Sequence, residues 1–148
     1  MRFILIACLF LSQFALQAQT ARRLELLFLG DKGHHKPFDR LPALQSAVGV
    51  KGMNITYTES LKDLNTAYLN KFDALVIYAN HDSISTSQEA ALKSFVQGGK
   101  ALIPLHSASF CFRNSDWYVQ AVGGQFSTHG TGRFTTKLLE PNLNQIFL

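Results

Sequence analysis

Three short runs of almost entirely apolar residues constrain the fold of this chain more than any other feature. They extend from Leu24 to Leu29, from Ala74 to Ala79 and from Ala101 to Leu105. Each has the length of one strand, and continuous apolar sequence of that length indicates a strand that is buried on both faces. A more polar run from Asn54 to Thr58 is a fourth strand candidate. Strands of this kind are typical of parallel sheets that are covered by helices.

Amphipathic segments with readable ends separate the strand candidates. One helix is predicted from about Pro37 to Gly49. A second begins with the T-x-x-E capping box of Thr86 and Glu89 and ends at Gly98. A third runs from about Ser115 to Val122. Alternating strands and helices predict βαβ units, and therefore an α/β fold with an open parallel sheet and helices on both faces.

Size and charge narrow the functional classes. A chain of 148 residues favours one domain with a substantial hydrophobic core. The formal net charge is +4, from 14 Lys and Arg against 10 Asp and Glu, and among the basic residues only Arg22 and Arg23 form even a pair. Nucleic-acid binding normally requires basic residues clustered on one face. We therefore expect no nucleic-acid partner.

The N-terminus has the layout of a secretory signal peptide over residues 1–18. Arg2 precedes an apolar run from Phe3 to Leu11, and we expect cleavage after Ala18. The run is shorter than the ~20 apolar residues that span a bilayer, so stable membrane insertion is not expected. The mature protein is then extracytoplasmic, either periplasmic or secreted, and its domain covers residues 24–148.

Only Cys111 is left once a signal peptide carrying Cys8 is removed, so the mature chain has no intramolecular disulfide. A lone cysteine between Phe110 and Phe112 is more typical of a small buried hydrophobic residue than of a nucleophile. No G-x-C-x-G or G-x-S-x-G elbow follows any predicted strand, and no glycine-rich loop matches a nucleotide-binding fingerprint. These patterns favour a site without a covalent nucleophile.

All five histidines follow the ends of predicted strands or lie in a glycine-rich turn. They are His34, His35, His81, His106 and His129. In an open parallel sheet the ligand crevice lies outside the carboxyl ends of the strands. The same loops carry further hydrogen-bonding side chains, namely Asp31, Asn80, Asp82, Ser107 and Ser109. A sheet edge that is polar and able to exchange protons suits a polyol or a sugar.

The histidines allow three interpretations: metal ligands, general acids and bases, or braces that hold the loops by hydrogen bonds. No H-x-x-x-H or H-E-x-x-H spacing is present, so a divalent metal such as zinc is the weaker alternative, and no other cofactor is expected. Our leading assignment makes His106 and His81 the proton-transfer groups, with Asp82 as their orienter. Substrate binding is assigned to the other candidates, which are His34, His35, Asn80, Ser107 and His129.

Several motifs occur in a fixed order along the chain. They are Phe72 to Tyr78, Asn80-His81-Asp82, Gln88 to Leu102, Leu105 to Phe110 and Gly123 to Gly132. Together they resemble the ThuA-like (trehalose utilisation) family over about residues 24–143. The resemblance implies a flavodoxin-like α/β fold of the class I glutamine amidotransferase-like superfamily. It also implies a role in sugar metabolism, acting on trehalose-like or oxidised keto-disaccharides.

The chain departs from the family pattern in two places. Amidotransferases carry their nucleophilic cysteine in a strand-to-helix turn, where this chain reads Leu105-His106-Ser107-Ala108, so glutaminase activity is not expected. Family domains continue with further strands beyond the segment that resembles Glu140-Pro141-Asn142, so we expect the domain to be incomplete at its C-terminus. The sheet edge left open there is able to pair with a second chain, which makes a homo-oligomer a further expectation.

The leading hypothesis is an exported ThuA-like domain that acts in carbohydrate metabolism and binds a small sugar among its strand-end histidines. The alternative is a non-catalytic carbohydrate-binding or partner-docking module on the same fold. The missing nucleophile elbow favours this alternative.

Overall fold

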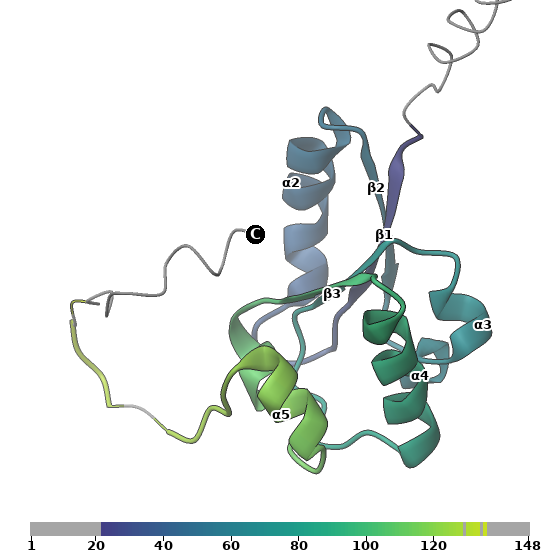
Figure 1. The fold of residues 1–148 in the computed structure, drawn as a ribbon. Coiled ribbons are helices and arrows are strands. Elements are labelled where there is room, and N and C mark those ends of the chain that lie inside the picture. The colour runs from purple at the N-terminus through teal and green to yellow at the C-terminus, as the bar shows by residue number, and fades with distance from the viewer. Residues whose placement is uncertain (1–21, 129, 134, 136–148) are drawn as a thin grey trace, which may run out of the picture.

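The computed structural model describes residues 22–128, 130–133 and 135, and a parallel β-sheet forms their centre (Figure 1). Its strands are β1 (Leu24–Leu29), β2 (Met53–Thr58), β3 (Ala74–Ile77) and β4 (Ala101–Pro104). They lie in the order β2-β1-β3-β4, and each of these pairings is parallel. This is the strand order of flavodoxin-like sheets, so the predicted fold class is confirmed.

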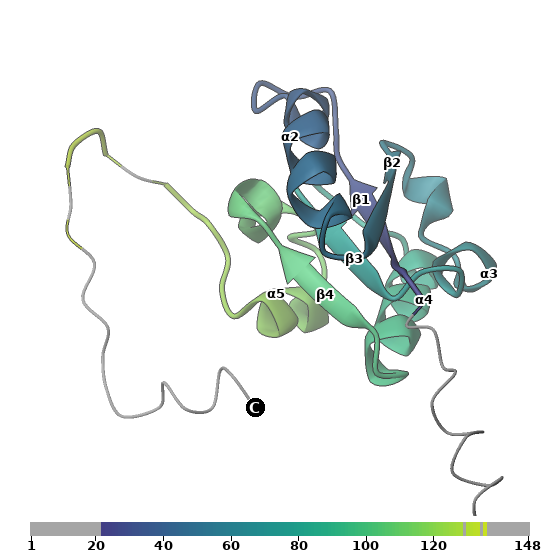
Figure 2. The same cartoon turned by 90° about the horizontal axis from the view of Figure 1, so that it is seen from above.

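Helices cover both faces of the sheet. The elements between the strands are α2 (Pro37–Gly49), η1 (Leu61–Asp63), α3 (Thr66–Leu69) and α4 (Thr86–Gln97), and β4 is followed by η2 (His106–Phe110) and α5 (Asp116–Val122). α2 lies on one face, whereas α3, α4 and α5 lie on the other (Figure 1 and Figure 2). No helix in the described ranges is long and apolar enough to cross a membrane.

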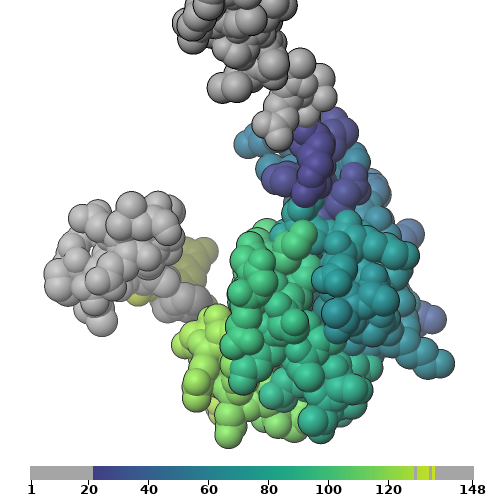
Figure 3. Space-filling model, turned by 45° about the vertical axis from the view of Figure 1, so that its right-hand side comes forward, coloured from purple at the N-terminus to yellow at the C-terminus, as the bar shows by residue number. Residues whose placement is uncertain are grey.

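The strands send alternate side chains into two separate cores. The core on the α2 face contains Leu26, Phe28, Ala74 and Val76 from the strands and Leu41 from α2. The core on the other face contains Leu27, Leu29, Leu75 and Ile77 from the strands, with Leu69, Leu92 and Phe95 from α3 and α4. In the space-filling view the teal and green segments that include α3 and α4 form one continuous surface over this second core (Figure 3). Burial on both faces explains why the runs that form β1 and β3 are apolar at successive positions.

β4 differs from the expected strand with two buried faces, because it lies at an edge of the described sheet. Leu102 packs against the core that contains α4. Ile103 points to the other face, since its register partner Val76 belongs to the α2 core. α2 packs against β2 at the far edge of the sheet, which leaves Ile103 37% exposed. The apolar run therefore predicted the strand correctly and its burial wrongly.

The capping box of α4 lies one residue earlier than the sequence suggested. Ser85, rather than Thr86, has the extended backbone of an N-cap, and its Oγ accepts a hydrogen bond from the Gln88 N–H at 3.3 Å. Gln88 completes the box, because its Oε1 accepts from the Ser85 N–H at 2.9 Å. The Gln88 Nε2 also donates to the Leu61 carbonyl at 2.7 Å. A glutamate such as Glu89 has no N–H to make this additional contact.

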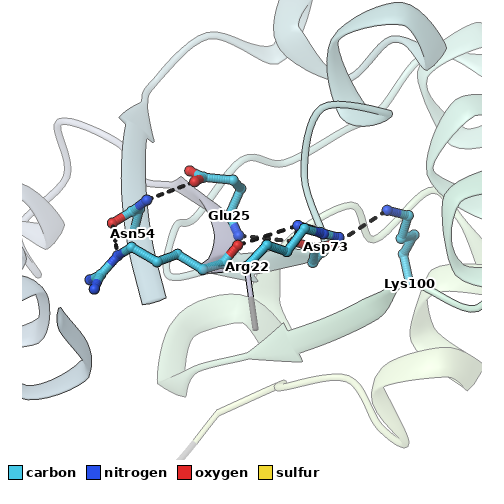
Figure 4. A network of polar contacts seen from close by, with 6 residues as sticks. Arg22, Glu25, Asn54, Asp73 and Lys100 are labelled. Atoms are coloured by element: carbon cyan, nitrogen blue, oxygen red, sulfur yellow. Dashed lines mark hydrogen bonds and ion pairs between the residues drawn. The ribbon is translucent and has the colours of Figure 1, made fainter. Parts of the chain in front are cut away.

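A network of ion pairs and hydrogen bonds closes the amino-terminal edge of the sheet (Figure 4). The Asp73 carboxylate accepts hydrogen bonds from the Arg22 guanidinium at 2.5 and 2.7 Å and from the Glu25 backbone N–H at 2.9 Å. The Lys100 ammonium lies 3.4 Å from the same carboxylate. These donors, Arg22 above all, hold the pKa of the Asp73 carboxyl well below its usual range. The network joins the starts of the strands, at the edge opposite the histidines.

Candidate functional site

A pocket of about 570 Å³ opens at the carboxyl-terminal edge of the sheet, a volume typical of small-ligand sites. Its walls come from the loops after β1 and β3, from η2 and from the loop after α5. The lining residues are His34, His35, Asn80, His106, Ser107, Ser109, Phe110 and Phe126. The chain places β2 on one side of β1 and then crosses over to place β3 on the other side. Open α/β sheets bind ligands at such a switch point.

Asp31 ties together the loops that follow β1 and β3. Its Oδ1 accepts a hydrogen bond from the Gly33 N–H at 2.7 Å, which forms a tight turn within the first loop. Its Oδ2 accepts a hydrogen bond from the Asn80 N–H just after β3. The Asp31 carboxylate thereby restricts where His34 and His35 lie relative to Asn80.

The turn after β4 holds His106 in a backbone conformation that residues other than glycine rarely adopt. Its φ is 45°, in the left-handed region. One residue earlier, Leu105 still continues the sheet by donating its N–H to the Ile77 carbonyl at 2.8 Å. The sharp turn from strand to helix is thus present, although the glycine signature of an elbow is missing from the sequence. Such strain costs about 1 to 3 kcal/mol and is concentrated at functional sites.

Two imidazoles and a phenol meet over the end of β3. The ring centroids of His35 and His106 are 4.5 Å apart. Tyr78, which directly follows β3, lies 6.0 Å from the His35 ring and 5.7 Å from the His106 ring. β3 lies between β1 and β4, so the loops after those two strands reach across its end. Sequence reasoning missed Tyr78, and its position directly after a buried strand was the available signal.

His34 and His35 are also in contact, with ring centroids 3.9 Å apart. Partial burial, followed by the neighbouring imidazoles of His34 and His106, lowers the pKa of His35. The nearby Asp31 carboxylate acts in the opposite direction. His35 is therefore a neutral imidazole at pH 7, with one nitrogen that donates and one that accepts a hydrogen bond.

The imidazoles of His34 and His35 contact each other through tilted rings. Their planes meet at 42°. Among the described residues, no group of three or more His, Cys, Asp and Glu side chains is arranged to hold a metal ion.

Two polar oxygens on the pocket wall are buried without a hydrogen-bond partner in the part of the chain that the structure describes. They are the Oδ1 of Asn80 and the Oγ of Ser107. Ser107 is only 7% exposed, so its hydroxyl is inside the protein although the residue lines the pocket. Buried polar groups are nearly always paired, and an unpaired one costs about 1 to 3 kcal/mol. Both oxygens therefore keep unused hydrogen-bonding capacity directly behind the pocket surface.

His81 and Asp82 lie beside the pocket but do not line it. The Nε2 of His81 is 3.1 Å from the Gly30 carbonyl oxygen, and the His81 ring stacks on Phe112 with centroids 6.3 Å apart. The Asp82 carboxylate forms an ion pair with Arg113 at 2.7 Å. The structure thus brings together His34, His35, Asn80, His106 and Ser107 from the predicted site. His129 lies outside the described residues.

Comparison with known proteins agrees with this architecture. The chain matches a family model described as trehalose utilisation, ThuA, over residues 26–145. This chain belongs to the ThuA family. It is similar to a crystal structure of a ThuA-like protein from Bacteroides uniformis, with a TM-score of 0.59 and 14% sequence identity, which supports the fold. That match covers 71% of this chain and 45% of the other, so this chain spans less than half of that relative's length. No curated protein matches the chain.

The pocket of this ThuA family member has an aromatic wall that sequence reasoning missed. Phe110 and Phe126 meet edge to face, with ring centroids 6.1 Å apart. The Phe126 N–H donates to the Ser109 carbonyl at 3.0 Å, which anchors the loop after α5 to η2. Gly123, with a φ of 88°, ends α5 and starts this loop. Nothing local in the sequence indicates that a loop following a helix returns to the sheet edge.

Cys111 of this ThuA family member is confirmed as a buried residue rather than an accessible nucleophile. Its exposed fraction is 0%, and its Sγ donates a hydrogen bond to the Ala79 carbonyl at 2.8 Å. Burial raises the pKa of the Cys111 thiol to about 12, so the reactive thiolate is not formed at neutral pH.

Proposed function

We propose that this ThuA family member binds a carbohydrate in the pocket at the carboxyl-terminal edge of its sheet and acts on it by acid–base chemistry. The observation that carries the proposal is the burial of two unpartnered oxygens, Asn80 Oδ1 and Ser107 Oγ, in the wall of a pocket that also contains His35 and His106. Sugar hydroxyls donate to such oxygens and also accept from imidazole N–H groups. The family description, trehalose utilisation, supports the same ligand class.

The mixed lining of the pocket matches the two kinds of surface on a sugar ring. The lining combines polar groups, the histidines with Asn80 and Ser107, with the aromatic rings of Phe110 and Phe126. A sugar ring carries hydroxyl groups around its rim and C–H groups on its faces. The aromatic rings suit the C–H faces of a sugar, and the polar side chains suit its hydroxyl groups.

We assign proton transfer to His106 and His35. A neutral His35 accepts a proton from a sugar hydroxyl, or from the carbon beside a keto group, and returns it in a later step. His106 is held in position by its strained turn, in contact with His35. His81 and Asp82 then act as braces of the loop after β3, through Gly30 and Arg113.

A non-catalytic carbohydrate-binding module is the second candidate. The burial of Cys111 supports it, because a thiol that is removed from solvent does not act as a nucleophile on a sugar. Both candidates require the oxygens of Asn80 and Ser107 for binding. They differ in whether His106 transfers a proton.

Calorimetry with trehalose tests the binding site. Ser107→Ala removes one hydrogen-bonding group, so we expect trehalose affinity to fall about fivefold to tenfold. The free variant should be at least as stable as the parent, because the substitution removes an unpartnered buried hydroxyl. Ser83→Ala, at an exposed position outside the pocket, is the matched control. Unchanged affinity in Ser107→Ala would contradict the proposed site.

Turnover of a keto-disaccharide separates the enzyme from the binding module. An enzyme loses turnover in His106→Ala, while the folded variant still binds the sugar with reduced affinity. A parent protein that binds the sugar without converting it is the binding module.

We further propose that the protein acts outside the cytoplasm after removal of residues 1–18. The support is the charged start at Arg2, the apolar run after it and the polar boundary after Ala18. N-terminal sequencing of exported protein should begin at Gln19. A mature form that still begins at Met1 would contradict this localisation.

A further inference from the structure

The carboxylate of Asp31 joins the loops that follow β1 and β3, although Asp31 itself does not line the pocket. It is partly buried and comes directly after Gly30. Its Oδ2 accepts a hydrogen bond from the Asn80 N–H. In the adjacent contact, the Nε2 of His81 lies 3.1 Å from the Gly30 carbonyl oxygen. Two neighbouring contacts therefore connect the loops, and one of them depends on the side chain of Asp31.

The other oxygen of Asp31 shapes the turn that leads to the first two histidines. This Oδ1 accepts a hydrogen bond from the Gly33 N–H at 2.7 Å. A Cβ atom at Gly33 would lie 2.9 Å from the same oxygen, so a side chain at this position would push against the carboxylate. Glycine therefore lets the chain turn tightly around Asp31. His34 and His35 follow directly after Gly33, so the positions of both imidazoles depend on this turn.

The Asp31 carboxylate forms no ion pair within the part of the chain that the structure describes. The neighbouring cation, Lys32, pairs with Glu59 at 3.8 Å instead. The other described ion pairs involve the carboxylates of Asp73 and Asp82. The negative charge of Asp31 is therefore not balanced by a cationic side chain. A partly buried carboxylate of this kind stabilises a positive charge that develops nearby.

His35 is the imidazole on which this charge acts. The groups around its ring are His34 from the same loop, His106 from η2 and Tyr78 after β3. The two neighbouring imidazoles disfavour a proton on His35, whereas the Asp31 carboxylate favours one. Of these described groups, Asp31 is the one whose charge supports the protonated ring.

We propose that Asp31 is a positioning residue of the pocket, which fixes His35 relative to Asn80 and stabilises the proton that His35 accepts. This inference rests on the proposed function, in which the neutral ring takes a proton from the ligand. Asp31 acts through two backbone N–H groups and through its charge, without touching the ligand. The proton moves from the ligand to a ring nitrogen of His35, where the carboxylate stabilises the imidazolium until the proton is returned.

A proton NMR titration of the histidine rings, on the full chain without ligand, tests the effect of the charge. We expect the midpoint of the His35 resonance to move to lower pH in Asp31→Asn, because burial and the neighbouring imidazoles then act unopposed. Asp31→Glu keeps the charge, so its midpoint should stay close to that of the parent. Asp39→Asn, an exposed change in the first turn of α2 and outside the pocket, removes an equal charge and is the matched control. The resonance is assigned by its absence in His35→Gln.

Calorimetry with trehalose at about pH 8, above the range in which histidines titrate, tests the positioning. Asp31→Asn turns one of the two acceptor oxygens into an N–H₂ group, so one backbone hydrogen bond is lost. Asp31→Glu keeps both oxygens but is longer by one methylene group. We expect both variants to bind trehalose about threefold to tenfold more weakly than the parent, and Asp39→Asn to bind it equally well. Circular dichroism checks that each variant is folded.

The possible results separate the role of Asp31 from the proposed function. A His35 midpoint that is the same in the parent and in Asp31→Asn, or full trehalose affinity in both Asp31 variants, overturns the positioning role and leaves the proposed function standing. An equal shift in Asp39→Asn makes the effect one of net charge and also overturns the role. Should Asp31→Asn fail to fold, Asp31→Glu decides: full affinity overturns the role, and weakened affinity at an unchanged midpoint supports it. A parent that does not bind trehalose overturns the proposed function and the role of Asp31 together.

Discussion

The ring centroids of His106 and His35 are 4.5 Å apart, with the two ring planes at 74°, although His106 follows β4 and His35 follows β1. β3 separates these strands in the sheet, and Tyr78 at its end is no more than 6.0 Å from either ring. The pair is therefore produced by the order of the strands. Partial burial, followed by the neighbouring imidazoles of His34 and His106, lowers the pKa of His35, which keeps the His35 ring neutral at pH 7.

We expect trehalose affinity to fall as the pH decreases from about 7 to 5, the range in which histidines titrate. The pKa of His35 is lowered, so its ring is neutral at pH 7, and once protonated it can no longer accept a hydrogen bond. Calorimetry across this range should show the loss, and His35→Gln should flatten it. An affinity in the parent that does not change with pH would argue against a ligand contact at His35.

Folding must be checked at each pH, because the same group affects stability. The folded state lowers the pKa of His35, so the folded protein binds this proton less readily than the unfolded chain. The free energy of unfolding therefore also falls as the pH drops below the ordinary histidine value of about 6.5. Circular dichroism at each pH separates unfolding from loss of affinity.

His106→Gly should raise stability and impair the site. The left-handed φ of 45° is strained for histidine and unstrained for glycine, so we expect a gain of about 1 kcal/mol in the free energy of unfolding. Proton transfer and trehalose affinity should both fall. His81→Ala is the matched comparison: it loses the contact with Gly30, so stability should fall by about 1 kcal/mol while affinity is kept. Denaturant melts and calorimetry measure both quantities, and the opposite pattern would exchange the roles of the two histidines.

Asp73→Asn should lower the free energy of unfolding by about 1 to 3 kcal/mol at pH 7, because it removes a charge that accepts bonds from Arg22 and Glu25. The folded state depresses the pKa of Asp73, so its stabilisation is present above the unfolded value of about 3.9 and is lost as the pH falls through the folded value. Melts between pH 7 and pH 2 should show a smaller decline of the free energy of unfolding in the variant than in the parent.

Asp82→Asn is the control, since that carboxylate is 73% exposed and its ion pair contributes less than about 1 kcal/mol. Parent and variant with the same pH dependence would show that the network does not stabilise the fold.

Phe95→Ala should cost about 3 to 5 kcal/mol, as truncations of large aromatic residues in a core do. Phe95 is 4% exposed and belongs to the core between α4 and the sheet. Phe38→Ala, at a ring that is 58% exposed, should cost less than about 1 kcal/mol. Urea melts of both variants provide the comparison, and a small loss in Phe95→Ala would mean that the core is assigned to the wrong helix face.

Sequence reasoning predicted only part of the candidate site. His34, His35, Asn80, His106 and Ser107 lie together because each follows a parallel strand at one edge, which is a property of the fold class. His81 follows a strand as well, yet its ring packs on Phe112 and contacts the Gly30 carbonyl. Strand position predicts the edge at which a side chain lies, but not the direction in which it points.

The amino-acid sequence by itself determined the strands, the helices and the edge of the sheet at which the histidines were expected. A strand that is buried on both faces requires a continuous apolar run, which a short window of sequence between helical segments shows directly. Only the tertiary structure decided that His35 meets His106, and that Phe126 returns to the pocket. Those outcomes depend on the order β2-β1-β3-β4 and on hydrogen bonds between distant residues, such as Asp31 to Asn80 and Phe126 to Ser109. Contacts of that kind depend on how whole elements pack, and no short window of sequence contains both partners.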